Sequence, residues 1–464
     1  MRRASVVGVL AAAVAATTLP DNVPGIAVPL VAILVAAAVA LAAPVDAVAL
    51  GYGLLSVMLS AMAAVRAAEW VVALDLLGSL FFATLAASGL ESWGDLLRAP
   101  LRVLASAGRA PGILLRPLLP RWRGAGRAVP VLRGVVVGLL LVLGFGALFV
   151  SADRAFAEIV DRLLIPSWDL DLLPLRLFVF VSVGLLVGAL AASRPALLGE
   201  PRPWSEATGR EGAWEGRRRS VVEWGITLGL LDALFLIFVA VQITFLFGGH
   251  ELVQRTLGLT YATYAREGFF QLLIAAGLVL AVVAAAVRSS AAETERDRRI
   301  LKTALGILCL LTLVILASAL RRLSLYEEAF GFTRPRLVAH SLLLWVGAVV
   351  LMVIAAGFRW QGRWLPRAVA ALAGASLLLF SAIDPDGTIA SRNVERYERV
   401  GKIDLAYART LSLDAVPALA RLPHELRREA LLAFDRPPAD GWAGWNLGRS
   451  RARSILASPG EGRS

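Results

Sequence analysis

The chain has 464 residues, of which 58% are hydrophobic and only 18% are charged. A soluble protein of this length keeps a charged exterior, so this composition excludes an ordinary soluble protein and indicates that lipid surrounds most side chains. The net charge of +12 does not indicate a nucleic-acid partner, because the basic residues lie beside the ends of apolar segments and the sequence has no zinc-finger or aromatic-interleaved basic pattern.

About eleven apolar segments follow one another along the chain. All but the first are about as long as a helix needs to cross a hydrocarbon core of roughly 30 Å. Backbone groups in lipid must pair internally, and the segments are apolar on all sides rather than alternating as barrel strands do. We therefore predict an all-α fold, a polytopic transmembrane helical bundle. The segments are 5–19, 24–43, 46–66, 70–90, 134–152, 176–192, 224–248, 268–287, 300–320, 337–357 and 366–383.

Residues 1–90 hold about four of these spans. Two interpretations of segment 5–19 remain: a retained first span, which we favour, or a signal peptide whose small residues suit a cleavage site. Further along this region alanines are dense, as at Ala36, Ala37 and Ala38. Small side chains let helices approach closely in lipid, where packing drives their association.

Residues 91–133 form a connection that is rich in arginine and that we expect in the cytoplasm. Its stretch Trp93–Leu104 places apolar side chains against Arg98 and Arg102, and Pro100 is expected to break it. Two interpretations stay open. The stretch is either an amphipathic segment on the anionic inner leaflet or a loop packed under the bundle.

The placement of arginine predicts the orientation of the bundle. With the N-terminus inside, the connections counted as inside are 44–46, 91–133, 193–222, 288–299 and 358–366. Those after residue 90 are rich in arginine, whereas the outside connection 153–175 is acidic. The positive-inside rule thus predicts a bacterial cell-membrane protein with its N-terminus inside and its C-terminus outside. The connection 321–336 fits less well, because it carries four arginines and is counted as outside.

Residues 134–383 form the core membrane domain with about seven spans, and 384–464 form a polar tail. Within the tail, Ser412–Leu422 carries a helix-start pattern, with Ser412 or Asp414 as cap and Pro417 in the first turn. His424–Phe434 and Trp442–Leu456 also have helical spacing, with Pro437 and Pro438 between them. We expect a small helical cap on the extracytoplasmic face.

Two acids stand inside apolar spans, where a charge costs at least about 2.5–3.5 kcal/mol on insertion scales. Asp232 and Asp75 are candidates for carrying protons or binding ions, although pairing with a neighbouring helix is the interpretation we favour. Gln242 follows Asp232 on the same predicted helix. It lies roughly 80° around that helix and about 15 Å along it, so the two do not touch.

Two further stretches gather polar side chains that the topology places on the outer face with the tail. In the first, Tyr264, Glu267 and Gln271 share one helical face. In the second, Arg321 and Arg322 precede two glutamates, an arrangement that binds an anionic head group or pairs internally. For the first stretch the alternative is an aromatic belt at the membrane interface. The candidate polar site comprises Asp232, Tyr261, Tyr264, Arg266, Glu267, Gln271, Arg321, Arg322, Tyr326, Glu327 and Glu328, with Asp75, Gln242 and Asn393 as secondary candidates.

The sequence predicts no cofactor and no metal centre. Cys309 is the only cysteine, and the three histidines, His250, His340 and His424, have no ligand spacing. Phosphate-loop, hydrolase and kinase patterns are absent from the sequence as well.

Four stretches together resemble a known family: YATYAREGFFQLL (261–273), LRRLSLYEEAFGFTRPRL (320–337), NVERYERVGKIDLAYARTLSLDAVPAL (393–419) and WNLGRSRAR (445–453). The family is a bacterial multi-pass membrane family that carries only a domain-of-unknown-function label. The resemblance covers roughly 134–456 and implies an integral membrane protein with these motifs at its centre. It implies no activity and no catalytic residues. Asn393, Asp404 and Asp414 match the tail pattern without an assigned role.

Three functions are compatible with these features. The first is a membrane scaffold or sensor linked to the cell envelope. The second is a transporter or lipid-handling permease that uses the intramembrane acids and the outer-face cluster. The third is an intramembrane enzyme acting on a lipid head group. An enzyme is the least favoured of the three, and the expected partners are the lipid bilayer and an anionic lipid or envelope component. One shared cavity among the candidate residues would favour the second or third function, and side chains that pair within the protein would favour the first.

Overall fold

The computed structural model describes residues 2–110, 113, 173–193, 221–247, 269–289, 294–359 and 361–457, and every regular element within these ranges is a helix. Six of the described helices are long and apolar enough to cross a membrane. They cover Ala47–Ala64, Glu69–Ser88, Leu175–Ala192, Glu295–Phe330, Arg334–Arg359 and Leu365–Ala382. An all-helical fold is therefore confirmed for the described residues, and the six candidate spans agree with the predicted membrane protein. The total of about eleven spans stays a prediction, since the expected span 134–152 lies outside the described residues.

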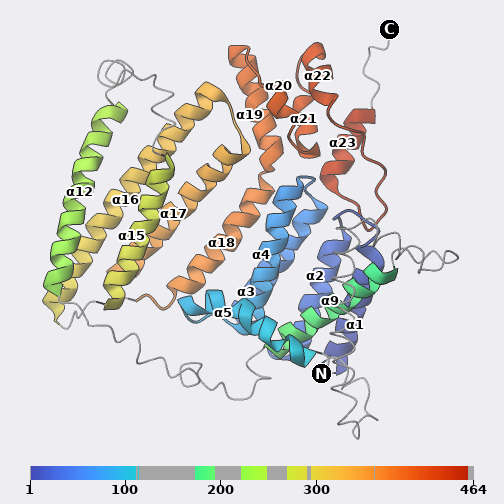
Figure 1. The fold of residues 1–464 in the computed structure, drawn as a ribbon, viewed down its shortest axis with the longest axis horizontal. Helices are drawn as coiled ribbons and strands as arrows, with labels where there is room; N and C mark the ends of the chain where they lie inside the picture. Colours follow the sequence, from blue (N-terminus) through green and yellow to red (C-terminus); the bar gives the residue numbers. More distant parts are fainter. Residues whose placement is uncertain are drawn as a thin grey trace, which may run out of the picture.

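One group of helices contains the N-terminal part of the chain (Figure 1). It comprises α1 (Arg2–Thr18), α2 (Ala27–Ala42), α3 (Ala47–Ala61), α4 (Glu69–Ser88) and α9 (Leu173–Ala192). Small side chains fill the contacts of α1 with α2 and α9, and Ala11 and Ala15 are fully buried. This is the close packing that the dense alanines predicted.

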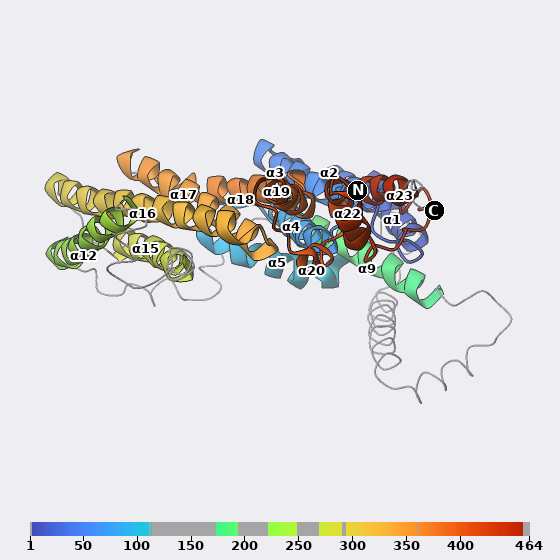
Figure 2. The same ribbon diagram turned by 90° about the horizontal axis from the view of Figure 1, so that it is seen from above.

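A second group lies at the other end of the long axis (Figure 2). It comprises α12 (Val221–Phe247), α15 (Phe269–Ser289), α16 (Glu295–Phe330) and α17 (Arg334–Arg359), with a core around Leu308 and Leu343. Helix α16 begins at a capping box formed by Thr294 and Asp297. It continues through the charged stretch after residue 320 and ends at Gly331, whose φ of +81° favours glycine.

Helix α18 (Leu365–Ala382) joins the two groups, because it contacts α17 on one side and α3 and α4 on the other. Gly374 allows the close approach to α4. A Cβ at this position would lie 2.7 Å from the ring of Phe82. Tyr52 of α3 donates a hydrogen bond to the Arg367 carbonyl at 3.1 Å, which joins α3 to the first turn of α18.

Helix α5 (Trp93–Ser106) lies across the end of the bundle near the N-terminus. The expectation that Pro100 breaks this helix was wrong. Pro100 lies inside the helix. A capping box of Ser92 and Asp95 stabilises the start of the helix, and Asp95 also forms an ion pair with Arg102. Leu97 and Leu101 are exposed while Ala99 and Val103 are buried, so the helix turns an apolar strip away from the protein. That geometry favours the interfacial interpretation.

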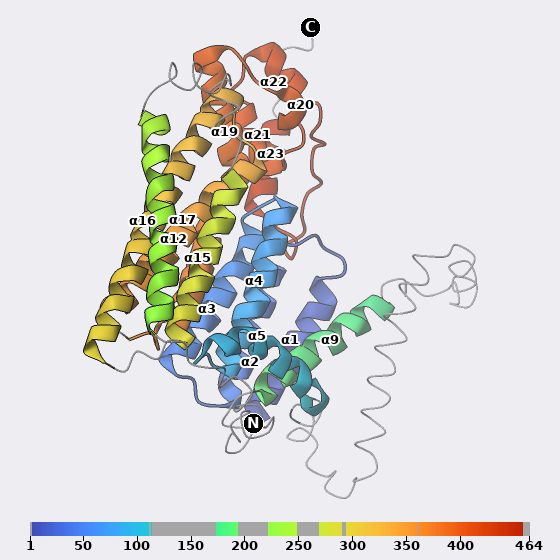
Figure 3. The same cartoon turned by 60° about the vertical axis from the view of Figure 1, so that its left-hand side comes forward.

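Residues 383–457, here called the C-terminal unit, stack on the opposite end of the bundle (Figure 3). The unit comprises α19 (Pro385–Val400), α20 (Leu405–Ala408), η5 (Leu413–Ala415), α21 (Val416–Leu419), α22 (His424–Leu431) and α23 (Leu447–Ala457). Its core is formed by Ile389, Val394, Ala415 and Leu419, all of them fully buried. A helical turn begins at Leu413, directly after Ser412 as predicted, but the Ser412 side chain makes no cap hydrogen bond; α22 begins at His424, as predicted.

The N-terminus lies at the end of the bundle that is distant from this unit (Figure 1). The α3–α4 turn and the α16–α17 turn both meet the C-terminal unit, as hydrogen bonds from Ala67 to Asp414 and from Phe332 to Asn393 record. The predicted alternation of the spans therefore agrees with the arrangement of the described helices, and the arginine-bearing turn after Phe330 lies beside the tail.

Candidate functional site

The candidates predicted on the membrane helices do not converge on one cavity within the described residues. Asp232 lies on α12 near Cys309 of α16, and its buried Oδ1 accepts no hydrogen bond from the described part of the chain. Cys309 precedes Tyr326 by almost five helical turns, or about 25 Å along α16. Gln242 and Gln271 lie on α12 and α15. Tyr261, Tyr264, Arg266 and Glu267 lie outside the described residues.

The C-terminal part of α16 faces the protein on one side. Arg321 and Glu328 are exposed, whereas Arg322 and Glu327 are buried. The Glu327 carboxylate lies 3.4 Å from Nδ1 of His340, and the Arg336 guanidinium stacks 4.1 Å from the centre of the Tyr326 ring. These two contacts join the end of α16 to the start of α17. None of these side chains lines either of the two cavities described below.

The two remaining secondary candidates are paired. Asn393 of α19 accepts a hydrogen bond from the Phe332 N–H at 2.8 Å and donates to the Phe332 carbonyl at 2.9 Å. Asp75 of α4 is fully buried and accepts the Ser381 hydroxyl at 2.7 Å. Asn393 thus joins the α16–α17 turn to α19, whereas Asp75 joins α4 to the end of α18, just before the segment that begins the C-terminal unit.

That segment carries the acid at the centre of the junction, Asp386. Its side chain is 0% exposed. Arg334 binds it with both arms of the guanidinium, Nε at 2.8 Å and Nη2 at 2.6 Å. Trp70 Nε1 donates to it at 3.3 Å and the Ser412 N–H at 2.8 Å. One carboxylate therefore connects α4, α17 and α19 with the backbone of Ser412, directly before η5.

Burial acts to raise the pKa of Asp386, but the hydrogen bonds from Arg334 and Ser412 and the charge of Arg334 outweigh it and hold the pKa below its ordinary value. The Tyr407 hydroxyl extends the network by accepting the Arg334 N–H at 2.7 Å. With its hydrogen bonds made, this ionised carboxylate is a structural junction and offers no open position for a ligand.

Asp384 stands two residues earlier, at the N-cap of α19. Its backbone is in the left-handed region, with φ 56°, which costs an ordinary residue about 1–3 kcal/mol and which aspartate tolerates better than most. Its carboxylate accepts the Gly387 N–H at 3.2 Å and pairs with Arg66 at 3.3 Å. Arg66 itself donates to the carbonyl of Ser381 at 2.7 Å. The α3–α4 turn is thus bound to the end of α18.

Asp414 binds the same turn from the other side. Its Oδ2 accepts the N–H groups of Ala67 at 2.7 Å and Ala68 at 2.9 Å. Burial and then the nearby Asp384 carboxylate raise the pKa of Asp414 to about 6. Asn446, fully buried, donates to the carbonyls of Ala63 and Arg66, both at 2.8 Å. Three polar side chains of the C-terminal unit therefore hold one turn of the membrane bundle.

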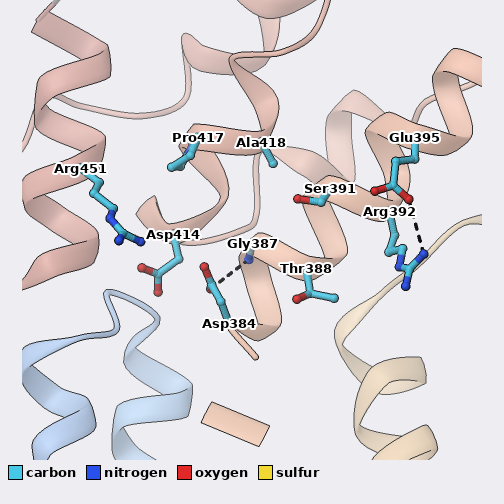
Figure 4. Close-up of a pocket in the computed structure, with 10 residues that line it drawn as sticks. All are labelled: Asp384, Gly387, Thr388, Ser391, Arg392, Glu395, Asp414, Pro417, Ala418 and Arg451. Atoms are coloured by element: carbon cyan, nitrogen blue, oxygen red, sulfur yellow. Dashed lines mark hydrogen bonds and ion pairs between the residues drawn. The ribbon is translucent and has the colours of Figure 1, made fainter. Parts of the chain in front are cut away.

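A cleft of about 640 Å³ opens beside these acids (Figure 4). Asp384 and Asp414 turn their carboxylates toward each other at its base, and the Arg451 guanidinium of α23 lies next to Asp414. Burial raises the pKa of Asp384, an effect that Arg66 only partly offsets. The lining residues are Asp384, Gly387, Thr388, Ser391, Arg392, Glu395, Asp414, Pro417, Ala418 and Arg451.

A second cavity of about 400 Å³ lies among α2, α3, α4 and α9. Apart from three serines, its lining is apolar, and Ser56 donates to the Ser79 carbonyl at 2.8 Å. In the described part of the chain no group of three or more His, Cys, Asp or Glu side chains is arranged to hold a metal ion. The chemistry at the junction is therefore charge pairing and hydrogen bonding by side chains.

Sequence reasoning did not identify the residues at the centre of this site. Asp386, Arg334 and Arg66 carried no assigned role, and Asp414 was noted only as part of a pattern. A signal was present in Asp384-Pro385-Asp386, because an acid followed by proline directly after a span marks a capped helix start. The partners of these acids could not be read from spacing.

Comparison with known proteins gives one match. A family model described as a domain of unknown function, DUF4153, matches residues 53–422. No curated protein and no solved structure matches the chain. The matched range begins within α3, contains α4, α16 to α19 and Asp414, and ends before α22 and α23.

Proposed function

The chain belongs to the DUF4153 family, a domain of unknown function, and on its geometry we propose that it is a multi-pass scaffold or sensor of the bacterial cell membrane. In this proposal the helices anchor the protein, and the C-terminal unit, outside the cytoplasm, receives an envelope signal or partner. The cleft between Asp384, Asp414 and Arg451 is the receiving site.

The Asp386 network is the observation that carries this proposal. A sensor must transmit what happens at its exposed part to its membrane part, and this requires a rigid connection rather than a flexible linker. Asp386 connects Trp70 of α4 and Arg334 of α17 to the C-terminal unit through a buried carboxylate. Asn393 adds the α16–α17 turn to the same connection. A displacement of α19 is therefore felt in both helix groups.

The pairing of the described candidates also supports a scaffold or sensor over a permease. A permease needs polar groups that face a shared path at mid-depth, often beside broken helices. Asp75 instead is hydrogen-bonded to Ser381, and α16, α17 and α18 run without interruption. The orientation with the C-terminal unit outside rests on the arginine-rich connections at the opposite end of the bundle.

A lipid-handling permease remains the second candidate, and one observation favours it. The buried Oδ1 of Asp232 accepts no hydrogen bond within the described residues. An unsatisfied acid on an apolar helix is costly, and such residues are common in ion and proton pathways.

Complementation of a deletion strain separates the two candidates. Asp232→Asn keeps the size of the side chain and removes its charge. If the protein is a scaffold or sensor, this variant restores the deletion phenotype at normal protein level, and Asp386→Ala does not. If the protein is a permease that uses Asp232, Asp232→Asn fails while the folded protein is present in the membrane, and profiling of lipids and metabolites in the deletion strain identifies the compound that accumulates.

Cysteine labelling in whole cells tests the orientation. Cys309 is buried, so it is first replaced by alanine, and single cysteines are then placed at exposed positions at the two ends of the bundle. Val400→Cys should react with an impermeant maleimide in intact cells, whereas Gly362→Cys should react only after permeabilisation. Reaction of Val400→Cys from the cytoplasmic side alone would overturn the proposed function.

A further inference from the structure

The cleft at the junction differs from the network beneath it in one respect: its charges are not all matched. Asp386 has its full set of partners, but Arg451 forms no ion pair within 4.0 Å in the described part of the chain, and its side chain is exposed. The carboxylates of Asp384 and Asp414 face each other without a hydrogen bond between them. The anchoring contacts occupy Oδ2 of Asp414, and its Oδ1 lies against Gly448 of α23.

Two facing carboxylates repel each other. Arg66 forms an ion pair with Asp384 but not with Asp414, so a second cation between the two acids relieves the repulsion that remains. A metal ion is a poor candidate, because no third acid or histidine in the described residues completes a ligand set. A primary ammonium group suits the geometry, since its three N–H donors can reach both carboxylates and a hydroxyl at the same time. Thr388 and Ser391 supply hydroxyls on the face of α19 that follows Asp384.

Arg451 adds the second half of the recognition. Its guanidinium lies beside Asp414 and can form a bidentate contact with a carboxylate or phosphate group. An anionic group placed there would stand a few ångströms from the ammonium position. Charges of both signs at this separation match a compact zwitterion, and neither a simple anion nor a simple cation satisfies both.

We propose that the cleft binds a zwitterion in which a primary ammonium lies close to an anionic oxygen group, with the ammonium between Asp384 and Asp414 and the anion on Arg451. This inference rests on the proposed function, in which the cleft is the receiving site. The chemistry occurs in free amino acids and in the ethanolamine phosphate head group of a membrane lipid. The position of the cleft at the end of the bundle makes both sources accessible.

Calorimetric titration of the full-length protein in phosphatidylglycerol nanodiscs tests the proposal. The probes are O-phosphoethanolamine and glycine, and phosphocholine is the matched control, because three methyl groups replace its N–H donors. We expect at least one of the first two to bind and phosphocholine to bind at least about tenfold more weakly. In nanodiscs that contain phosphatidylethanolamine, weaker apparent binding of free phosphoethanolamine assigns the site to the lipid head group. Unchanged binding assigns it to a free ligand.

Arg451→Gln is the decisive variant, since the side chain is exposed and its loss leaves the fold intact. It should raise the Kd at least about tenfold, whereas Arg428→Gln, on the exposed side of α22, should leave the Kd unchanged. Equal binding of phosphocholine, an unchanged Kd for Arg451→Gln, or no binding of any probe would each overturn the proposal. These results are independent of the cysteine labelling. A C-terminal unit on the cytoplasmic side would defeat the proposed function and leave zwitterion binding by the purified protein measurable.

Discussion

Replacement of Asp386 should release the C-terminal unit from the membrane helices. Asp386→Ala removes the acceptor of the Arg334 guanidinium, the Trp70 indole and the Ser412 N–H together. Loss of one partner of a buried ion pair costs about 3–5 kcal/mol. The Arg334 side chain is 32% exposed and can regain water, so the lower part of this range applies and we expect about 3–4 kcal/mol. Asp386→Asn keeps one acceptor oxygen and should cost about 2 kcal/mol.

Thermal unfolding in detergent, followed by tryptophan fluorescence, measures this loss, because Trp70 lies in the network and changes environment when it opens. Limited proteolysis provides a second readout, with cleavage expected in the segment after α18. A double-mutant cycle with Arg334→Gln should give a coupling energy of about 2 kcal/mol, since the two side chains contact each other directly.

The matched control is Asp404→Asn. Asp404 caps α20 from an exposed position by accepting the Tyr407 N–H at 2.9 Å, and asparagine caps helices equally well. The same chemical change should therefore alter stability by less than about 0.5 kcal/mol. A wild-type melting curve for Asp386→Ala, or a coupling energy near zero, would refute the assignment of Asp386 as the junction.

Three further predictions concern the same junction. Because the pKa of Asp414 is raised to about 6, the folded protein binds this proton more tightly than the unfolded chain does. The contribution of Asp414 to stability is therefore largest at low pH and falls by up to roughly 2–3 kcal/mol as the pH rises from about 4 to about 6. Between pH 4.5 and 7 the melting temperature of Asp414→Asn should change less steeply with pH than that of the wild type, and an equal slope would contradict this prediction. Gly448→Ala should loosen the packing of α23, because the new Cβ would overlap Asp414 and lie 3.1 Å from Ala67. The free energy of unfolding should fall by about 1–3 kcal/mol, as measured by thermal unfolding. Gly357→Ala, where the new Cβ meets open space, is the control and should not be destabilised. Asp75→Ala should cost about 1–3 kcal/mol by leaving the Ser381 hydroxyl without its acceptor, whereas Asp75→Asn should preserve folded yield in the membrane, and an equal loss in both variants would show that the charge itself is needed.

The membrane helices could be predicted from the sequence because a single physical property, apolar length, defines them. The predicted segment 337–357 lies within α17, which extends it by three residues at its start and two at its end. The largest difference is at α16, predicted to leave the bilayer near residue 320 but helical to Phe330. The charged residues there are good helix formers, and nothing before Gly331 ends the helix. Apolarity marks where a helix crosses lipid, and does not mark where it stops.

The junction could not be predicted, because its contacts join residues far apart in the chain. Asp386 binds Arg334, 52 residues earlier, and Trp70, 316 residues earlier. Asp75 was identified, since a charge within an apolar span is visible by itself, but its partner Ser381 was not. Burial of Asp386 was equally hidden, because an acid after a proline in a polar tail is usually exposed. The sequence pattern pointed to α16, while the described structure places its most completely paired acid on α19.

Asp384 and Asp414 take part both in the cleft and in the contact with the α3–α4 turn, so ligand binding in the cleft is coupled to that contact. The same carboxylates that line the cleft also hold Arg66 and the N–H groups of Ala67 and Ala68. A ligand that engages these acids therefore changes the free energy of the contact with the α3–α4 turn, and by linkage the strength of that contact changes the affinity for the ligand by the same factor. Asp386→Ala, which opens the junction without touching the cleft, should then also weaken zwitterion binding. If the affinity of this variant equals that of the wild type, the cleft is a passive site and the rigid connection serves only to anchor the unit.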